Sequence, residues 1–212
     1  MENPVIILGA GYLGRMAKEI LESNGNVVYG FLDDDKKLHG QEVDDATVLG
    51  SMDDNGFLKL IGKKCEACVA VDENRLKKNL VTMLNEQRHV QPVNAVHKGA
   101  YLSPKAVLGH GNLIDRSVQA GAGVVIGNHA VIHAGTIIGV GAQIGDYVQI
   151  GAGSIINPGA VIEEGAFIGT GVTIVAGLTI GRNARIGAGS VVIAPVAEGE
   201  TVFGNPAQKV KT

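Results

Sequence analysis

The hydrophobic and polar positions of residues 102–192 repeat with a period of six. Every sixth residue is small or aliphatic, without interruption, in the series Leu102, Leu108, Ile114, Ala120, Ile126, Ile132, Ile138, Ile144, Ile150, Ile156, Ile162, Ile168, Ile174, Ile180, Ile186 and Val192. A second small or branched residue usually follows four positions later. An amphipathic helix would repeat about every 3.6 residues and a half-buried strand about every two. The period of six therefore excludes both as the organising element.

Each hexad is predicted to form one short strand and one corner, with a glycine after many of the aliphatic residues to allow the bend. Three hexads that close a triangle make an 18-residue coil, so the 90 residues from Leu102 to Val192 make five coils. Stacked coils of this kind form a solenoid with one continuous core. We therefore predict a parallel β-helix for residues 93–212. The hexapeptide pattern resembles that of left-handed β-helix acyltransferases, which implies that the coil is left-handed.

The first 92 residues show a different pattern, that of alternating strands and helices. An apolar run at residues 4–8 leads into Gly9-x-Gly11-x-x-Gly14, and Met16, Ile20 and Leu21 then follow at helical spacing. In this context the glycines allow a tight turn, close approach of a ligand and close helix packing, with a phosphate at the helix N-terminus. The pattern predicts a Rossmann-like nucleotide-binding domain over residues 1–92. Glycines that merely close a strand–helix turn are the alternative.

Acidic residues follow the next expected strand. The stretch NVVYGFLDDD ends in Asp33, Asp34 and Asp35, at the usual distance for carboxylates that bond ribose hydroxyls or a base. Farther on, CEACVAVDENRLKKNLVTML indicates a strand followed by a helix, which completes a small parallel sheet. The stretch from 91 to 106 is predicted to lead into the first coil.

Composition and charge exclude several classes of function. The formal net charge is −3 without a block of like charges, so we expect no nucleic-acid partner. No apolar run approaches the roughly 20 residues that span a bilayer, and the N-terminus lacks the features of a secretory signal. We therefore expect a cytoplasmic protein without a membrane partner. Cys65 and Cys68 form a lone C-x-x-C, which we interpret as strand-edge cysteines because a zinc site needs a second pair.

Apolar residues also occupy outward positions of the predicted prism, namely Val125, Val131, Ile137, Ile155, Val161 and Phe167. A solvated face rarely carries so many apolar groups, so we expect other subunits to cover part of it. Scattered surface apolar residues are the alternative.

The segments VIILGAGYLGR, GFLDDD and VLGS, the uninterrupted hexads and the closing Gly204-Asn205-Pro206-Ala207 are together similar to bacterial sugar acyltransferases of the sialic acid and bacillosamine pathways. The resemblance covers nearly the whole chain. It implies that the first domain holds a nucleotide-sugar, that acetyl-CoA is the cosubstrate and lies between the prisms of a homotrimer, and that a histidine oriented by a carboxylate accepts the proton. The positions implied for the nucleotide-sugar are Gly9, Gly11, Tyr12, Leu13, Gly14, Asp33 and Asp34.

The sequence departs from this family where the chemistry is expected. The family's catalytic histidine and its carboxylate fall on Gly139-Val140-Gly141, and valine cannot accept a proton. A second family histidine near acetyl-CoA falls on Gln149, and the glycine–histidine of the nucleotide turn is replaced by Tyr12-Leu13. Asp33 and Asp34 match the family's nucleotide carboxylates.

His133 is the candidate for a relocated base, because it stands where the family usually has an asparagine facing the same cleft. His110 and His129 are other corner histidines. His129 and His133 also form a His-x-x-x-His pair, but residues four apart in a β-helix do not share one helical face. We therefore predict no metal site, and solvent-exposed corner histidines remain the alternative to catalysis.

The resemblance also implies positions along which acetyl-CoA would bind, at corners with small residues: Gln149, Pro158, Thr170 and Ala188.

The most favoured function is an acyl-CoA-dependent acetyltransferase that acts on a nucleotide-linked amino sugar or a related sugar. A neutral amine attacks a thioester readily, so a weak base favours an amine acceptor over a hydroxyl. The alternative is a catalytically inactive homologue that binds a nucleotide or sugar, which the loss of both family histidines supports. A dinucleotide-dependent enzyme is the least favoured function, since no hydride-transfer site is visible.

Overall fold

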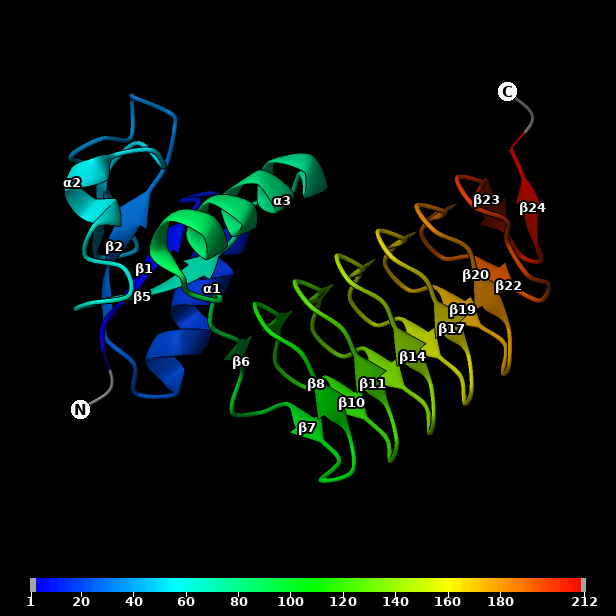
Figure 1. Ribbon diagram of the computed structural model, residues 1–212. Helices are drawn as coiled ribbons and strands as arrows, with labels where there is room; N and C mark the ends of the chain where they lie inside the picture. Colours follow the sequence, from blue (N-terminus) through cyan, green and yellow to red (C-terminus); the bar gives the residue numbers. More distant parts are fainter. Residues whose placement is uncertain (1–2, 211–212) are drawn as a thin grey trace. The chain divides into compact units, whose positions relative to one another are not determined.

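The computed structural model describes residues 3–210 and divides into two compact units, Met1–His97 and Lys98–Thr212 (Figure 1). The first unit is α/β and the second is a prism of parallel strands. Both predicted classes, a Rossmann-like domain and a β-helix built on hexads, are confirmed. In the part of the chain that is described, no helix has the length and apolar character to cross a bilayer.

The first unit is built on a five-stranded sheet in the order β3-β4-β2-β1-β5. Its strands are β1 (Val5–Leu8), β2 (Val28–Leu32), β3 (Glu42–Val43), β4 (Ala46–Gly50) and β5 (Glu66–Val69). β1 pairs in parallel with both β2 and β5, and only the edge pair β3–β4 is antiparallel. The interior strand β1 is buried along its whole length, which explains its continuous apolar sequence VIIL.

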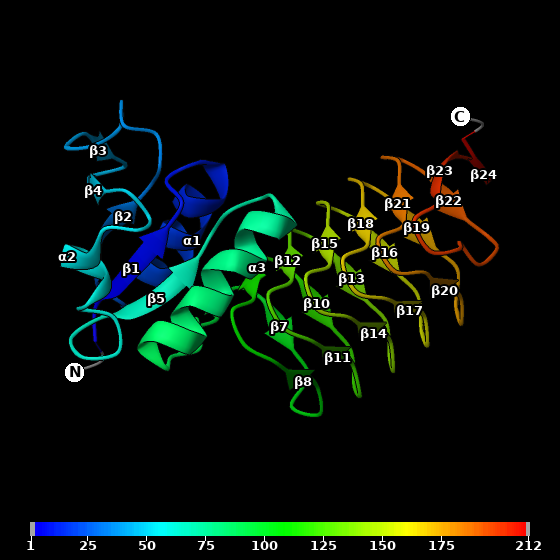
Figure 2. The same cartoon turned by 45° about the horizontal axis from the view of Figure 1, so that its top comes forward.

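Helices cover both faces of this sheet (Figure 2). α1 (Tyr12–Ser23) lies on one face and buries Leu13, Ala17, Ile20 and Leu21, a stripe at helical spacing. On the opposite face lie the short α2 (Asn55–Leu58) and α3 (Asn74–Met83), which continues as a π-helical turn from Leu84 to Arg88. Their apolar residues join those of β1 and β5 in one core cluster. β6 (Ala95–Val96) follows α3 and contacts α1 through a hydrogen bond from Asn24 Nδ2 to Val96 O, 2.7 Å.

The second unit repeats a two-residue strand every six residues. The strands are β7 (Tyr101–Leu102), β8 (Val107–Leu108), β9 (Leu113–Ile114), β10 (Gln119–Ala120), β11 (Val125–Ile126), β12 (Val131–Ile132), β13 (Ile137–Ile138), β14 (Gln143–Ile144), β15 (Gln149–Ile150), β16 (Ile155–Ile156), β17 (Val161–Ile162), β18 (Phe167–Ile168), β19 (Thr173–Ile174), β20 (Thr179–Ile180), β21 (Arg185–Ile186) and β22 (Val191–Val192). Every third strand joins the same sheet, so that partners are 18 residues apart, as in β10 with β13. The predicted coil length is therefore confirmed.

The inward positions of the prism are those of the hexad series. The second residue of each strand from β9 to β22 is buried, while many first residues face outward. Val125 and Ile137 are exposed to 41% and 43%, but Val131, also at an outward position, is only 1% exposed. Successive coils are tied by backbone bonds such as Ile137 N to Ser154 O, 2.9 Å. Buried hydroxyls donate hydrogen bonds to neighbouring backbone carbonyls, as Ser154 Oγ does to Gly169 O.

The hexad pattern ends at Val192, yet one sheet continues beyond it. β23 (Thr201–Gly204) pairs in parallel with β21, and β24 (Ala207–Lys209) folds back antiparallel onto β23. The sequence motif GNPA forms the turn between these two strands. The sheet therefore ends in a hairpin.

Candidate functional site

The glycine-rich turn joins β1 to α1, and each of its three positions is a glycine for a different structural reason. Gly9 has φ +108°, and a Cβ there would stand 2.6 Å from Ala70 O. A Cβ on Gly14 would run into the carbonyl oxygen of Gly9. At Gly11 a Cβ would meet nothing within 4 Å. Gly9 and Gly14 are thus required by packing, whereas Gly11 leaves open space at the N-terminus of α1, where a phosphate would approach.

Asp33 is held directly against this turn. Its Oδ2 accepts a hydrogen bond from Ala10 N at 2.7 Å, and its Oδ1 accepts one from Asp35 N at 2.9 Å. A ring nitrogen of His39 lies 2.7 Å from Asp33 O and fixes the backbone. The structure thereby brings together Asp33 and the glycine turn, which are separate in the sequence.

Tyr12 and Leu13 begin α1 and differ in what they offer a ligand. Tyr12 is 61% exposed, and its hydroxyl bonds to Asp72, which follows β5. Partial burial of the hydroxyl and this carboxylate raise the pKa of Tyr12 to about 12, so it remains a neutral donor. Leu13 is 2% exposed and packs in the core, so only its backbone can face a ligand.

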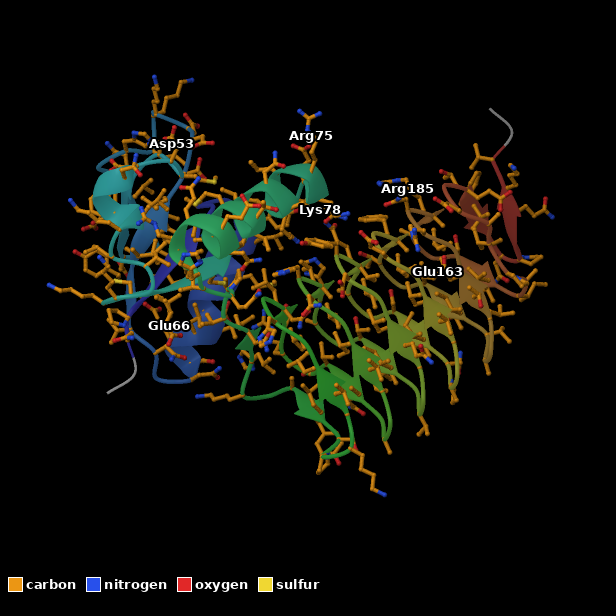
Figure 3. The ribbon with its side chains drawn as sticks, viewed as in Figure 1. Asp53, Glu66, Arg75, Lys78, Glu163 and Arg185 are labelled. Carbon is orange, nitrogen blue, oxygen red and sulfur yellow. The ribbon has the colours of Figure 1, made fainter. Side chains whose placement is uncertain are left out.

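An open cavity of about 800 Å³ lies on the α2 and α3 side of the sheet, and Asp34 is one of its walls. Its other lining residues come from the loop after β2, the loop after β4, α2 and α3: Lys36, Ser51, Met52, Asp53, Asn55, Leu58, Asn79, Leu80, Met83 and Gln87. Asp53 extends from the loop that precedes α2 (Figure 3). Asp34 Oδ1 accepts a hydrogen bond from Met52 N at 2.9 Å, which ties the two loops together. The cavity therefore adjoins the carboxylates that follow β2.

Lys77 is a buried cation in the same unit. It is 1% exposed, and its Nζ has no hydrogen-bond partner among the described residues. Burial lowers its pKa to about 8, although the nearby Asp72 and Cys68 act in the opposite direction. Cys65 and Cys68 are both buried free thiols.

In the prism, His133 stands at the corner that follows β12. Its backbone N donates to Ile150 O at 2.9 Å, and its O accepts from Thr136 Oγ1 at 2.8 Å, so the corner is firmly held. The ring is half-buried. Directly above it in the same column, 18 residues apart, stand Gly151, Gly169 and Gly187, which carry no side chain. A Cβ on Gly151 would run into Thr170 N, so the column above His133 is closely stacked backbone without side chains.

The positions expected for acetyl-CoA fall on two different corners. Thr170 and Ala188 are exposed on the corner of His133, and Gln149 lies one coil above Val131 in the adjoining sheet. Pro158 is exposed one coil above Val140, on the next corner. Only the 2-residue strand β13 separates the two corners within a coil.

His110 and His129 lie on the third corner. His129 stacks on Tyr147 with ring centroids 5.0 Å apart, and Asp146 Oδ1 accepts a hydrogen bond from Asn128 N at 2.7 Å. His129 precedes β12 and His133 follows it, so the pair occupies two corners rather than one. Among the described residues, no group of three or more His, Cys, Asp or Glu side chains could hold a metal ion.

Comparison with known families and structures supports both units. A model described as PglD N-terminal domain matches residues 4–84, and one described as bacterial transferase hexapeptide (six repeats) matches residues 141–176 and 159–194. The solved structure of PerB from Caulobacter crescentus, in complex with CoA and GDP-perosamine, is 28% identical, with a TM-score of 0.90 over 100% of this chain and 99% of that chain. The chain is thus similar, in both units, to left-handed β-helix sugar acyltransferases.

Two further acyltransferase structures agree over the same length. The acetyltransferase domain of PglB from Neisseria gonorrhoeae, in complex with acetyl coenzyme A, is 25% identical with a TM-score of 0.90, over 99% of this chain and 100% of that one. WeeI from Acinetobacter baumannii is 25% identical with a TM-score of 0.87, over 98% and 99%. The search of curated proteins gave no match.

The corner of Val140 differs from what the resemblance to sugar acyltransferases implies. The side chain of Val140 is 59% exposed, at the position expected for the catalytic histidine. Val175 and Ile193, on the same side of later coils, are also exposed, at 41% and 57%. The corner thus presents an apolar surface without a proton acceptor.

Sequence reasoning missed several residues of the candidate site. Asp53, Asn79 and Gln87 line the cavity but belong to no sequence motif. In the sequence, Lys77 resembles an ordinary exposed lysine of a helix. One signal was present for Lys77, because it shares a helix face with Leu80, Val81 and Leu84. A charge on an apolar face is the pattern that marks a buried cation.

Proposed function

We propose that the protein is an acyl-CoA-dependent acetyltransferase that acts on a nucleotide-linked amino sugar. The observation that carries this proposal is the match over the whole chain to PerB, whose structure contains CoA and GDP-perosamine. The glycine turn with Asp33 and the adjoining cavity supply a place for the nucleotide, in line with that match. The implied contacts to the nucleotide-sugar are Gly9, Gly11, Gly14, Tyr12, the backbone of Leu13, Asp33 and Asp34.

The reaction joins the nitrogen of the sugar amine to the thioester carbonyl carbon of acetyl-CoA. The amine attacks in its neutral form, the carbon–sulfur bond breaks, and CoA leaves as a thiolate while the amide forms. One proton must leave the nitrogen during this step. Val140 cannot accept it, so we assign the proton to the half-buried His133, from which the departing thiolate then takes it.

The corner of His133 suits the extended arm of acetyl-CoA. Thr170 and Ala188 are small and exposed on the corner of His133, and the backbone groups of a β-helix corner can bond the amides of the arm. Gln149 lies beside this corner and Pro158 lies on the next one. We propose these four residues as contacts of acetyl-CoA.

We further propose that the protein is a cytoplasmic homotrimer and that its nucleotide domain ends at residue 92. The outward side chains of Val125, Ile137 and Ile155 are exposed on the single chain, as a surface between subunits would be. We also propose that its activity requires no metal ion.

The test is release of CoA from acetyl-CoA in the presence of GDP- or UDP-linked 4-amino sugars. We expect turnover with the amino sugar and none with its hydroxyl analogue, because only the amine attacks without strong base catalysis. His133→Ala should lower kcat by about 100-fold or more, the usual contribution of a general base. His110→Ala, an exposed histidine on another corner, is the matched control and should retain full activity.

Unchanged turnover in His133→Ala would exclude the relocated base while leaving the acetyltransferase intact. A second function is favoured by one observation, the exposed Val140 at the family's base position. In that case the protein binds a nucleotide-sugar without transferring acetyl groups. Calorimetry separates the two, since a non-catalytic homologue would bind the nucleotide-sugar and release no CoA.

A further inference from the structure

The cavity beside Asp34 divides into an apolar floor and a polar rim. The floor is formed by Met52, Leu58, Leu80 and Met83. The rim carries two carboxylates, Asp34 and Asp53, against one ammonium, Lys36, together with amides and a hydroxyl: Asn55, Asn79, Gln87 and Ser51. An acidic rim disfavours a phosphate, so the charged part of a nucleotide belongs at the glycine turn. A flat ring with polar edges is the group that suits this cavity.

The two carboxylates are anchored through one oxygen each. Asp34 Oδ1 accepts the bond from Met52 N at 2.9 Å, and Asp53 Oδ1 accepts one from Ser51 Oγ at 2.5 Å. Among the described residues, nothing donates to the second oxygen of either side chain. Because an ionised carboxylate only accepts hydrogen bonds, each leaves a fixed acceptor for a ligand N–H. The cavity is therefore suited to bind a ring with several adjacent hydrogen-bond donors.

The bases differ sharply in this respect. Guanine presents N1–H and N2–H₂ side by side, whereas uracil presents a single N3–H between two carbonyl oxygens that a carboxylate repels. Lys36 and the rim amides can donate to guanine O6 and N7. Met52 and Met83 offer thioethers that pack well against an aromatic ring.

We infer that this cavity is the base subsite and that it selects guanine, so that the substrate is a GDP-linked sugar. The inference rests on the proposed function, because it assigns the nucleotide of the same substrate. Asp33 lies between the glycine turn and Asp34, where a ribose would join the diphosphate to the base. Asp53 is the specificity-determining residue that sequence motifs do not mark.

The experiment is calorimetric titration of the full chain with GDP, UDP and ADP, repeated on two variants. Asp53→Asn removes the charge and replaces one of the two carboxylate oxygens with an amide NH2, which donates instead of accepting. Asp45→Asn removes the same charge from the exposed turn between β3 and β4. Asn tolerates the positive φ of Asp45, +63°, so this control keeps its backbone. We expect GDP to bind at least about 10-fold more tightly than UDP, the usual effect of two charge-assisted hydrogen bonds.

Asp53→Asn should weaken GDP by about 10-fold and leave UDP nearly unchanged, while Asp45→Asn changes neither. UDP binding as tightly as GDP, or an equal loss for both nucleotides in Asp53→Asn, would overturn the guanine assignment and leave the acetyltransferase standing. If the protein selects guanine but releases no CoA from acetyl-CoA and a GDP-amino sugar, the guanine assignment stands and the acetyltransferase function is refuted. Failure of all three nucleotides to bind would refute both.

Discussion

Lys77 shows how a single side chain can lower stability. Its pKa is about 8 in the folded chain and 10.5 in its ordinary state, so the unfolded chain binds more protons between these values. The free energy of unfolding therefore rises with pH across this window, and the cost of burying the charge is greatest below pH 8. The attraction of the nearby Asp72 raises the pKa of Lys77 and so offsets only part of this cost.

Replacement of the charge should relieve this cost. We expect Lys77→Met to raise the free energy of unfolding at pH 7 by as much as about 3 kcal/mol, since each pH unit corresponds to about 1.4 kcal/mol. The gain should shrink as pH approaches 10. Urea denaturation at several pH values measures it, with Lys63→Met, an exposed lysine, as control. A gain independent of pH would mean that better packing, rather than removal of charge, is responsible.

Asp33 links the loop after β2 to the glycine turn, and its loss should affect binding. We expect Asp33→Ala to weaken nucleotide-sugar affinity by about 10-fold or more, because a charged hydrogen bond to Ala10 N that shapes the turn is lost. Calorimetric affinity is the measurement. Asp35→Ala is the control, because the carboxylate of Asp35 accepts from the neighbouring Lys37 N and does not contact the glycine turn. Equal affinities in the Asp33 variant and the parent chain would remove this carboxylate from the site.

At the scale of elements, the glycines of the turn between β1 and α1 have two different roles. Gly14 is needed for packing, and Gly11 is needed for binding. Gly14→Ala places a Cβ against Gly9 O, so we expect a clear fall in Tm. Gly11→Ala places its Cβ in open space and should keep the parent Tm, yet lose nucleotide affinity because a methyl group stands where the phosphate approaches. Thermal denaturation and calorimetry on the same two variants make the comparison. A parent-like affinity in Gly11→Ala would show that the ligand lies elsewhere.

The elements also show what a sequence can reveal. The coils were predictable because one period of six governs 90 residues, and the glycine turn was predictable because three glycines and a strand lie close together in the chain. The cavity was not, since it is assembled from Asp34, Asp53, Leu58, Asn79 and Gln87, which share no local pattern. His133 and Val140 were recognisable only by their register in the repeat. Their contacts depend on which corners the coils bring above them.

At the scale of the whole molecule, the proposed assembly depends on exposed apolar side chains. Ile137 and Ile155 stand on adjacent coils of one sheet, 43% and 37% exposed. We expect the parent chain to sediment as three copies of 21.9 kDa, and the double variant Ile137→Glu, Ile155→Glu to sediment as one. Thr179→Glu, on another sheet, is the control. A monomeric parent chain would refute the trimer; a trimeric double variant would place the interface on a different face.

β24 covers the outer edge of β23, which would otherwise present unpaired backbone groups. In a coil that can be extended indefinitely, such an edge is a template for the first strand of another molecule. The chain without residues 205–212 should therefore keep its β-sheet signal but scatter light increasingly with concentration. The closing hairpin thus gives a finite length to a repeat that has no limit of its own.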